Sequence, residues 1–247
     1  MDNGPNSSKL ESAPRPFAGT PCDRLRAVQG RIARAAAEAG RDAATLRLLA
    51  VSKTFDAAAV RAMATCGQHE FGENYLQEAL EKQGALRELP LVWHFIGPIQ
   101  SNKTRAIAEN FSWVHSVDRL KIAERLSAQR PAGLAPLQAC LEVNVSGETS
   151  KGGVAVSELP ALAEAVSKLP GIRLRGLMAI PAQTPDMATQ RAAFRQVRAA
   201  YEALIACGHA LDTLSMGMSA DLEAAILEGA TVVRIGTALF GERKKNA

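Results

Sequence analysis

The stretch LRLLAVSKTF, from Leu46 to Phe55, contains a short apolar run that stops at Lys53. The run is too short for a helix with one buried face, and it lacks the alternation of a strand with one exposed face. Continuous apolar runs of this kind are typical of strands that are buried on both faces of a parallel sheet. Lys53 is therefore expected just beyond the carboxyl end of a buried strand.

Seven further segments resemble this run, and amphipathic segments separate them. These strands are expected at residues 69–73, 91–97, 111–117, 137–145, 172–181, 211–216 and 231–236. Many of the segments between them open with Ser or Asp and close on Gly, the residues favoured at helix starts and ends. An additional helix is expected before the first strand and closes near Gly40, and the last helix is shortened to residues 238–245.

Eight strand–helix units predict an α/β fold that closes into a (β/α)8 TIM barrel. The alternative is an open, doubly wound sheet, which is disfavoured because no GxGxxG motif follows the first strand. With 247 residues, of which 47% are hydrophobic, the chain is long enough for one barrel domain, expected over residues 23–247. Residues 1–22 are polar and rich in Pro, Gly and Ser, so we expect a disordered tail there rather than a signal peptide.

Composition argues against several classes of function. The formal charge is only +4, and the basic residues are scattered rather than gathered in a stripe, so a nucleic-acid surface is not expected. No apolar run reaches membrane-spanning length. The four cysteines lie far apart without a CxxC pair, which predicts reduced thiols in a cytoplasmic protein rather than disulfides or a zinc site. His94 and His115 fall on different strands without metal-ligand spacing, and we expect hydrogen-bonded barrel histidines.

The last two strands of the expected barrel end in loops that suit an anion. Ser215 and Ser219 lie in the SMGMS loop, where Ser219 is expected to cap the following helix, and Gly236 and Thr237 follow the final strand. Barrels of this type frequently bind a phosphate between these two loops. Either loop alone would be explained by the turn-forming tendency of Ser and Gly. Their position on neighbouring strands favours a phosphate site.

The expected phosphate site helps to decide between two interpretations of Lys53. A lysine at a strand end most often extends into solvent. In a barrel mouth of low dielectric, however, a lysine loses its proton more readily and can attack a carbonyl carbon. An amine opposite a phosphate site suits a ligand with an aldehyde at one end and a phosphate at the other. Pyridoxal 5'-phosphate (PLP) has this chemistry.

Arg234, two residues before Gly236, leaves two interpretations open. Against the pyridine nitrogen of PLP, a permanently charged arginine would donate a hydrogen bond and leave that nitrogen unprotonated, which weakens the cofactor as an electron sink. Alternatively, Arg234 forms a salt bridge with Glu142 or Glu228 at the surface or on the barrel floor.

Six motifs in order resemble one known family. The motifs AVSKTF, FGENYLQE, WHFIGPIQSNK, EVNVSGETSKGG, GLMAIP and LSMGMSADLEAAILEGATVVRIGTALFG are similar to those of the PLP homeostasis proteins, the PLP-binding proteins of the YggS/PROSC type. The similarity spans the chain from the first helix to the end. It implies an alanine racemase-like barrel (PLP fold type III) without the C-terminal β domain.

The resemblance also implies roles for individual residues. Lys53 would form the Schiff base with PLP, and Arg234 would face the pyridine nitrogen. Asn74 and Met216 would lie beside the ring. The phosphate would be held by Ser215, Ser219, Gly236 and Thr237. No catalytic residue and no metal ligand is expected.

The function that the resemblance implies is intracellular PLP (vitamin B6) homeostasis without robust turnover, with PLP-dependent apoenzymes as possible recipients. The main alternative is a PLP-dependent amino-acid racemase, which needs a second acid or base opposite Lys53. Tyr75 is the only tyrosine near the expected barrel mouth, and we expect a packed or hydrogen-bonding ring at the start of the second helix instead. A barrel without an added interface domain predicts a monomer, and a dimer formed through contacts between outer helices is the alternative. A weaker alternative is a phosphate-binding barrel without PLP, in which Lys53 is only a point charge.

Overall fold

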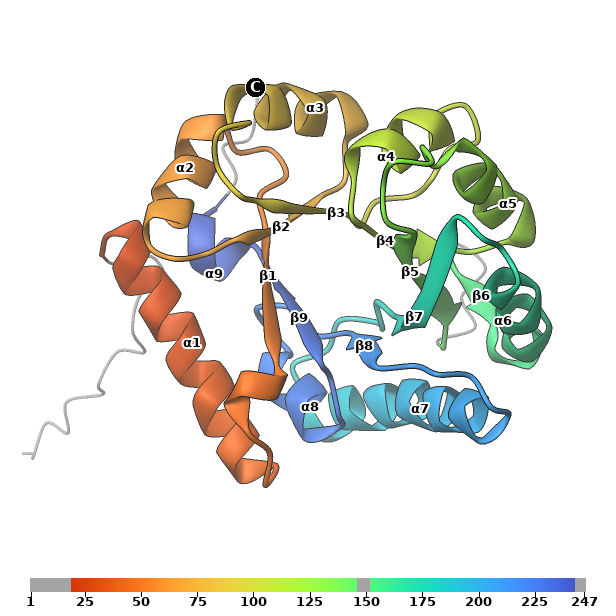
Figure 1. The fold of residues 1–247 in the computed structure, drawn as a ribbon. Helices are drawn as coiled ribbons and strands as arrows, with labels where there is room; N and C mark the ends of the chain where they lie inside the picture. The colour runs from red at the N-terminus through yellow and green to blue at the C-terminus, as the bar shows by residue number, and fades with distance from the viewer. Residues whose placement is uncertain (1–18, 146–151, 243–247) are drawn as a thin grey trace, which may run out of the picture.

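The protein is a closed barrel of eight parallel strands surrounded by helices, as Figure 1 shows. The computed structural model describes residues 19–145 and 152–242. The barrel strands are β1 (Arg47–Val51), β2 (Glu70–Glu73), β3 (Val92–Phe95), β4 (Trp113–Val117), β5 (Leu137–Asn144), β7 (Ile172–Met178), β8 (Thr213–Ser215) and β9 (Val232–Ile235). They pair in this order, and β9 closes the ring on β1. The predicted TIM barrel is confirmed.

A short strand outside the ring was not predicted. β6 (Val154–Ala155) pairs in parallel with the end of β5, through Val143 and Asn144. It lies just after the segment 146–151, which is outside the described residues.

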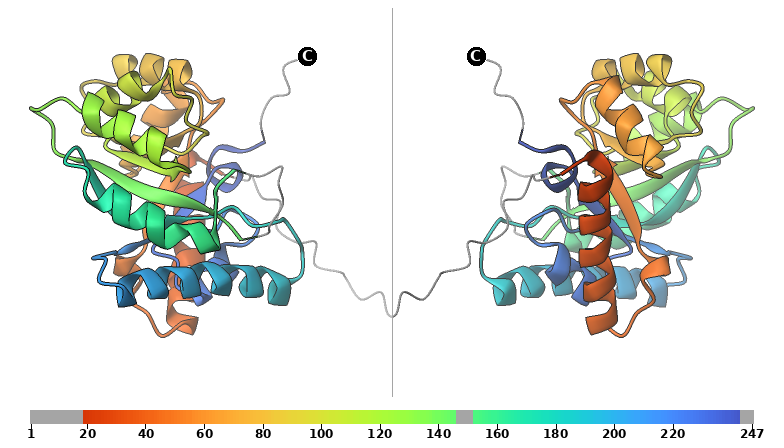
Figure 2. Two further views of the ribbon diagram at one scale, coloured as in Figure 1. Left: turned by 90° about the vertical axis from the view of Figure 1, so that its right-hand side faces the viewer. Right: turned by 90° about the vertical axis from the view of Figure 1, so that its left-hand side faces the viewer.

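Helices cover the outside of the barrel all around (Figure 1). They are α1 (Pro21–Glu38), α2 (Ala57–Thr65), α3 (Leu76–Ala85), α4 (Thr104–Asn110), α5 (Leu120–Gln129), α6 (Leu159–Ser167), α7 (Met187–Ala206), α8 (Leu222–Leu227) and α9 (Thr237–Phe240), with short 3-10 turns η1 (Ala43–Thr45) and η2 (Val156–Glu158). Helix α1 precedes the first strand and lies across the outside of the ring, as the right-hand view of Figure 2 shows. It contacts α2, α8 and α9.

The helix boundaries follow from local chemistry. Helix α1 begins with a capping box, in which the Thr20 side chain accepts from the Asp23 amide and the Asp23 side chain accepts from the Thr20 amide. The chain leaves α1 through Gly40 at φ +65°, a left-handed conformation that glycine adopts without strain. Asp56 and Asp186 cap α2 and α7. The final helix is shorter than predicted and ends at Gly241, and residues 243–247 lie outside the described part of the chain.

Burial explains why the strands read as apolar runs. Every residue of β4 and β9 is buried, because one face of each strand packs against helices and the other faces the barrel interior. The main core lies between strands and helices. A second, smaller cluster inside the barrel is formed by Leu49, Val51, Ile96 and Val232.

The prediction that all four cysteines are reduced is wrong. Cys22 and Cys66 form a disulfide with a Cα–Cα distance of 5.1 Å, whereas Cys140 and Cys207 are free thiols. The two bonded cysteines are 44 residues apart and belong to no local motif. They meet because α1 packs beside α2 and brings its first turn to the end of α2. This proximity arises only in the folded barrel.

Within the described residues, no helix is both long and apolar enough to cross a membrane.

Candidate functional site

A cavity of about 270 Å³ opens where the strands end at their carboxyl termini. Parallel strands of a closed barrel bring these ends to a single rim. The cavity is small even among ligand pockets, which typically enclose about 300–1,000 Å³. Six of the eight predicted site residues line it: Lys53, Asn74, Ser219, Arg234, Gly236 and Thr237.

The backbone on the amino side of Lys53 is held from below. Ser52 is fully buried, and its hydroxyl donates to Glu73 Oε1 at 2.6 Å. The ammonium of Lys82, from α3, donates to the Ser52 carbonyl at 2.8 Å and to the same Glu73 oxygen at 2.8 Å. Lys82 is only 4% exposed, and its hydrogen bonds fix the backbone next to Lys53.

The backbone on the other side of Lys53 is held in an unusual conformation. Thr54 has φ +70°, a left-handed value that costs energy in a residue other than glycine. Its amide donates to Glu78 Oε1 at 2.5 Å, and that oxygen also accepts from Lys82 at 2.6 Å. Sequence reasoning did not identify Lys82, Glu73 or Glu78 as supports of the site. Burial raises the pKa of Glu73, against the opposing effects of Lys82 and Ser52.

Arg234 lies inside the barrel at the base of the cavity and is 4% exposed. Its Nη1 donates to the Ser215 carbonyl at 2.5 Å and to Ser215 Oγ at 2.9 Å, and its Nη2 donates to the Ala179 carbonyl at 2.9 Å. Burial lowers its pKa to about 10, which leaves it charged at neutral pH. Two of its five N–H groups have no hydrogen-bond partner in the described part of the chain.

The alternative salt bridge between Arg234 and Glu228 is not formed. Glu228 accepts instead from Arg191 at 2.7 Å and from Arg195 at 2.9 Å, which join α7 to the end of α8.

The loop after β8 is anchored by a helix far away in the sequence. Arg31 of α1 donates to the Ser219 carbonyl at 3.0 Å and forms a two-point ion pair with Glu223. The prediction that Ser219 caps the following helix is wrong, because Asp221 holds the N-cap position of α8. The Ser219 hydroxyl instead accepts from the Ala238 amide at 3.4 Å and so joins the loops after β8 and β9.

The structure does not bring Ser215 and Met216 into the cavity. Both are fully buried. Ser215 points into the barrel beneath Arg234, and Met216, on the opposite face of the chain, packs in the core under the helices. Met218, two residues further along the same loop, lines the cavity. The second methionine of SMGMS was the available signal for this contact.

Asn74 brings a polar atom to the cavity without a partner. Its Oδ1 is buried and has no hydrogen-bond partner among the described residues. Its backbone packs tightly under Gly97, where a Cβ would lie 2.4 Å from the Asn74 carbonyl oxygen. Glycine at position 97 is therefore required to seat Asn74. A buried polar atom without a partner calls for an explanation, and a hydrogen bond from a bound ligand or from water supplies one.

Gly236 and Thr237 lie where β9 passes into α9. A Cβ on Gly236 would lie 3.3 Å from the Val51 carbonyl oxygen, so the chain passes close to β1 at this point. Helix α9 has four residues, and the amides of Ala238, Leu239 and Phe240 already donate to Ser219 Oγ or to the Gly236 carbonyl. The Thr237 amide and hydroxyl are therefore the donors that this loop offers to an anion.

Two further predictions concern ring side chains. His94 and His115 are hydrogen-bonded to each other, between Nδ1 and Nε2 at 3.0 Å, which confirms them as hydrogen-bonded barrel histidines. No cluster of three or more His, Cys, Asp or Glu side chains suited to a metal occurs in residues 19–145 and 152–242. Tyr75 lies at the start of α3, as expected, but it is 56% exposed, so the expectation of a packed ring is wrong.

Known proteins resemble this chain over almost its whole length. The profile of the family described as "Alanine racemase, N-terminal domain" matches residues 24–244. The pyridoxal phosphate homeostasis protein of Pseudomonas aeruginosa is 66% identical over 228 residues, which cover 92% of this chain and 98% of that protein. The protein of the same name from Escherichia coli is 50% identical over 222 residues, covering 89% and 95%.

Solved structures agree with these relatives. The structure of PipY from Synechococcus elongatus with PLP bound superposes with a TM-score of 0.79 at 37% identity, covering 90% of this chain and 100% of that one. An alanine racemase from Corynebacterium glutamicum superposes with a TM-score of 0.62 at 20% identity, covering 90% of this chain and 63% of that one, and this similarity concerns the fold alone. The profile match and the identities together place the chain in the family of pyridoxal phosphate homeostasis proteins, on the fold of the alanine racemase N-terminal domain.

Proposed function

We propose that this protein binds PLP in the cavity at the carboxyl ends of the strands and holds it covalently through the amine of Lys53. The observation that carries the proposal is the meeting of Lys53 with Ser219, Gly236 and Thr237 around one small cavity. It is supported by PipY, whose structure with PLP bound has the same fold at 37% identity.

The residues around the cavity fit the parts of PLP. The bound cofactor supplies an aldehyde that condenses with a primary amine, and an electron-withdrawing ring. Lys53 provides the amine, while the hydroxyls of Ser219 and Thr237 provide hydrogen bonds for a phosphate. Arg234 has two N–H groups to spare and stays charged, so it can donate to the ring nitrogen and keep that nitrogen unprotonated. The unpartnered Asn74 Oδ1 provides an acceptor beside the ring.

We further propose a role in PLP homeostasis without robust turnover. Racemisation needs two groups that exchange protons on opposite faces of the substrate. Of the described residues that line the cavity, Lys53, Asp221 and Arg234 can carry charge. Arg234 keeps its proton, and Asp221 already accepts from the Met218 amide at 2.5 Å. This set favours the binding of PLP over racemisation of a substrate. The role that we propose is storage and delivery of PLP to recipient apoenzymes, by a monomer in the cytoplasm.

Uptake of PLP tests the proposal. Purified protein incubated with PLP and passed through a desalting column should keep a visible absorbance band. Lys53→Ala should lose the band. Lys103→Ala, which removes an exposed lysine after β3, is the matched control and should keep it. A wild-type protein that leaves the column colourless would refute the proposal.

The alternative is an amino-acid racemase, with Asp221, the one carboxylate among the described residues that line the cavity, as the second acid or base. Incubation of the PLP-loaded protein with single enantiomers of a panel of amino acids separates the two functions. Racemisation at ordinary enzyme rates, about 1 per second or faster, that Asp221→Asn abolishes would establish the enzyme and overturn the carrier.

A further inference from the structure

A line of buried polar side chains crosses the barrel beneath the cavity. Arg234 donates to Ser215 Oγ at 2.9 Å, and Ser215 Oγ lies 2.8 Å from His115 Nδ1. The other nitrogen of His115 lies 3.0 Å from His94 Nδ1, and His94 Nε2 lies 3.4 Å from Glu70 Oε2. These five side chains, from β9, β8, β4, β3 and β2 in turn, are called the relay below.

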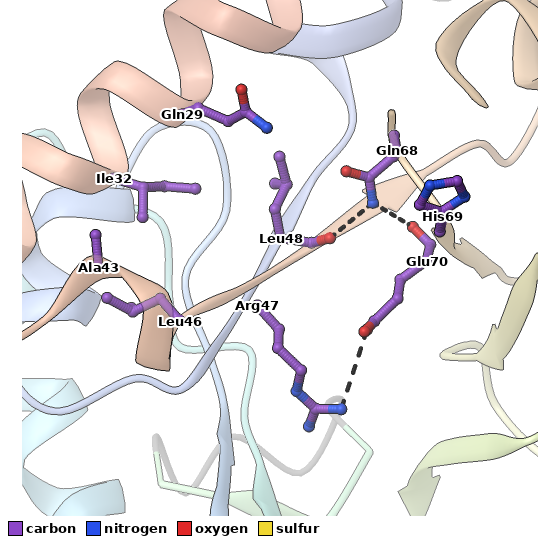
Figure 3. A pocket seen from close by; sticks show the side chains of 9 residues that line it. All are labelled: Gln29, Ile32, Ala43, Leu46, Arg47, Leu48, Gln68, His69 and Glu70. Atoms are coloured by element: carbon purple, nitrogen blue, oxygen red, sulfur yellow. Dashed lines mark hydrogen bonds and ion pairs between the residues drawn. The ribbon is translucent and has the colours of Figure 1, made fainter. Parts of the chain in front are cut away.

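The far end of the relay reaches solvent at the opposite rim. Glu70 is the first residue of β2, and its side chain is 27% exposed. It lines a second cavity, of about 380 Å³, between α1 and the beginnings of β1 and β2. Figure 3 shows its carboxylate directed toward Arg47, whose Nη1 lies 4.0 Å away. The histidines and Ser215, by contrast, are buried.

The protons at the two ends of the relay are fixed by chemistry. Arg234 only donates, so the Ser215 oxygen accepts from it. Burial opposes ionisation of Glu70, but His94 and Arg47 outweigh burial and hold the pKa of that carboxyl below its usual value. His94 Nε2 and Glu70 Oε2 are in ion-pair contact at 3.4 Å without hydrogen-bond geometry, and neither atom has a hydrogen-bond partner in the described residues. Because a carboxylate only accepts, we place the proton of His94 on Nε2, toward Glu70.

The protons between the ends then follow. Burial lowers the pKa of both histidines, and for His115 the lowering is large, because the positive charges of Arg234 and Arg47 add to the effect of burial. Each ring is therefore neutral and carries one N–H. His94 Nδ1 accepts, so His115 Nε2 donates. His115 Nδ1 accepts in turn, so Ser215 donates to it. Every hydrogen points from Arg234 toward Glu70.

Positive charge near the stacked Trp113 ring also favours a neutral His94. The His94 ring stacks on Trp113 with centroids 5.4 Å apart. Arg47 and Arg175 lie over the Trp113 ring, at 4.4 and 5.0 Å from its centroid, and Arg175 pairs with Asp212. Stacking orients the plane of the His94 ring, and the charge of Arg47 disfavours a positive charge on it.

We propose that Glu70, His94, His115 and Ser215 are positioning residues, which fix the rotation of Arg234 so that its two remaining N–H groups face the ring nitrogen of PLP. This inference rests on the proposed function. The Ser215 hydroxyl has one hydrogen, which it donates to His115 in a hydrogen bond. Its oxygen therefore remains an acceptor for Arg234. The charge of Glu70, on the opposite rim, thereby influences how Arg234 is oriented toward the cofactor.

Nitrogen NMR of the histidine rings tests the relay itself. In ¹⁵N-labelled protein without PLP at neutral pH, His94 and His115 should both be neutral Nε2–H tautomers. In Ser215→Ala, the Nδ1 resonance of His115 should move, because that atom loses its donor. An Nδ1–H tautomer or an imidazolium at either position would overturn the proposal.

PLP binding tests what the relay does. Ser215→Ala should weaken PLP binding about tenfold, because the charged Arg234 loses one of its three hydrogen-bond acceptors. Glu70→Gln should weaken it about threefold and displace the visible absorbance maximum, because the relay loses its charged acceptor. The controls are Ser127→Ala and Glu228→Gln, which remove a buried serine hydroxyl and a buried carboxylate outside the relay and should bind as the wild type does.

The outcomes are distinguishable. Circular dichroism shows that each variant is folded before binding is measured. Unchanged affinity and absorbance in both relay variants would overturn the positioning role. A wild-type protein that takes up no PLP would instead refute the proposed function, and the histidine tautomers would then decide whether the relay exists.

Discussion

Lys82 is buried beneath the loop that carries Lys53, and its three donated hydrogen bonds go to Ser52, Glu73 and Glu78. A buried ammonium with three acceptors is fully satisfied. Its removal, however, would leave the fully buried carboxylate of Glu73 without a counter-charge. The position of Lys53 thus depends on a second lysine that never touches the cavity.

Lys82→Met tests this dependence. We expect the free energy of unfolding to fall by about 3 kcal/mol, because one partner of a buried ion pair is removed and the other remains. PLP binding should weaken as well, because Ser52 and Thr54 are no longer held. The measurement is urea denaturation, followed by PLP titration. Lys168→Met, at an exposed pair with Glu164, should change stability by no more than about 0.5 kcal/mol. Equal effects of the two variants would contradict the role of Lys82.

At the scale of single residues, the sequence was sufficient to predict site residues that lie directly after the end of a strand. Lys53, Asn74, Gly236 and Thr237 follow their strands closely, and the cavity includes all four. Ser215 and Met216 are still at or next to β8, where alternation directs one side chain into the barrel and the other toward the helices. The sequence of the loop does not reveal where this alternation stops, so Met218 was missed.

At the scale of elements, the disulfide joins the beginning of α1 to the end of α2. Helix α1 also carries Arg31, which holds the Ser219 carbonyl from outside the barrel. Helix α1 is therefore linked covalently to α2 and by a hydrogen bond to the predicted phosphate loop. Neither link was predictable from sequence, because each joins residues that only the packing of α1 against the outside of the barrel brings together.

Reduction of this disulfide has a measurable consequence. The bond closes a loop with a sequence separation of 44 residues, and its loss should lower the free energy of unfolding by about 4 kcal/mol through the added entropy of the unfolded chain. Urea denaturation with and without dithiothreitol measures this difference. The Cys22→Ser variant should be as unstable as the reduced protein and should not respond to dithiothreitol. A wild type that does not respond either would contradict a stabilising disulfide.

At the scale of the whole molecule, the order of eight strands and their helices was predictable from the spacing of apolar runs. The interior of the barrel was not. Its polar centre, with two neutral histidines between Glu70 and Arg234, is formed by side chains from separate strands, and a sequence gives no direct sign of which strands face one another across a barrel.

This polar centre makes stability depend on pH. The pKa of His115 is lowered in the folded state, so below about pH 6.5 the unfolded chain binds the proton and the folded protein does not. Stability should therefore fall as the pH drops below that value. Between about pH 7.5 and pH 5, His115 accounts for a loss of up to about 2 kcal/mol. In His115→Asn, urea denaturation should show a correspondingly smaller loss, and an equal loss in both proteins would show that His115 is charged in the folded state.

The most direct test of the central claim is chemical. Protein loaded with PLP is reduced with borohydride, digested and analysed by mass spectrometry. We expect the mass of reduced PLP on one peptide, the one that contains Lys53, and no modification of Lys82 or Lys103. PLP spread over surface lysines with Lys53 unmodified would contradict the claim that this amine, at the mouth of the barrel, is the one that holds the cofactor.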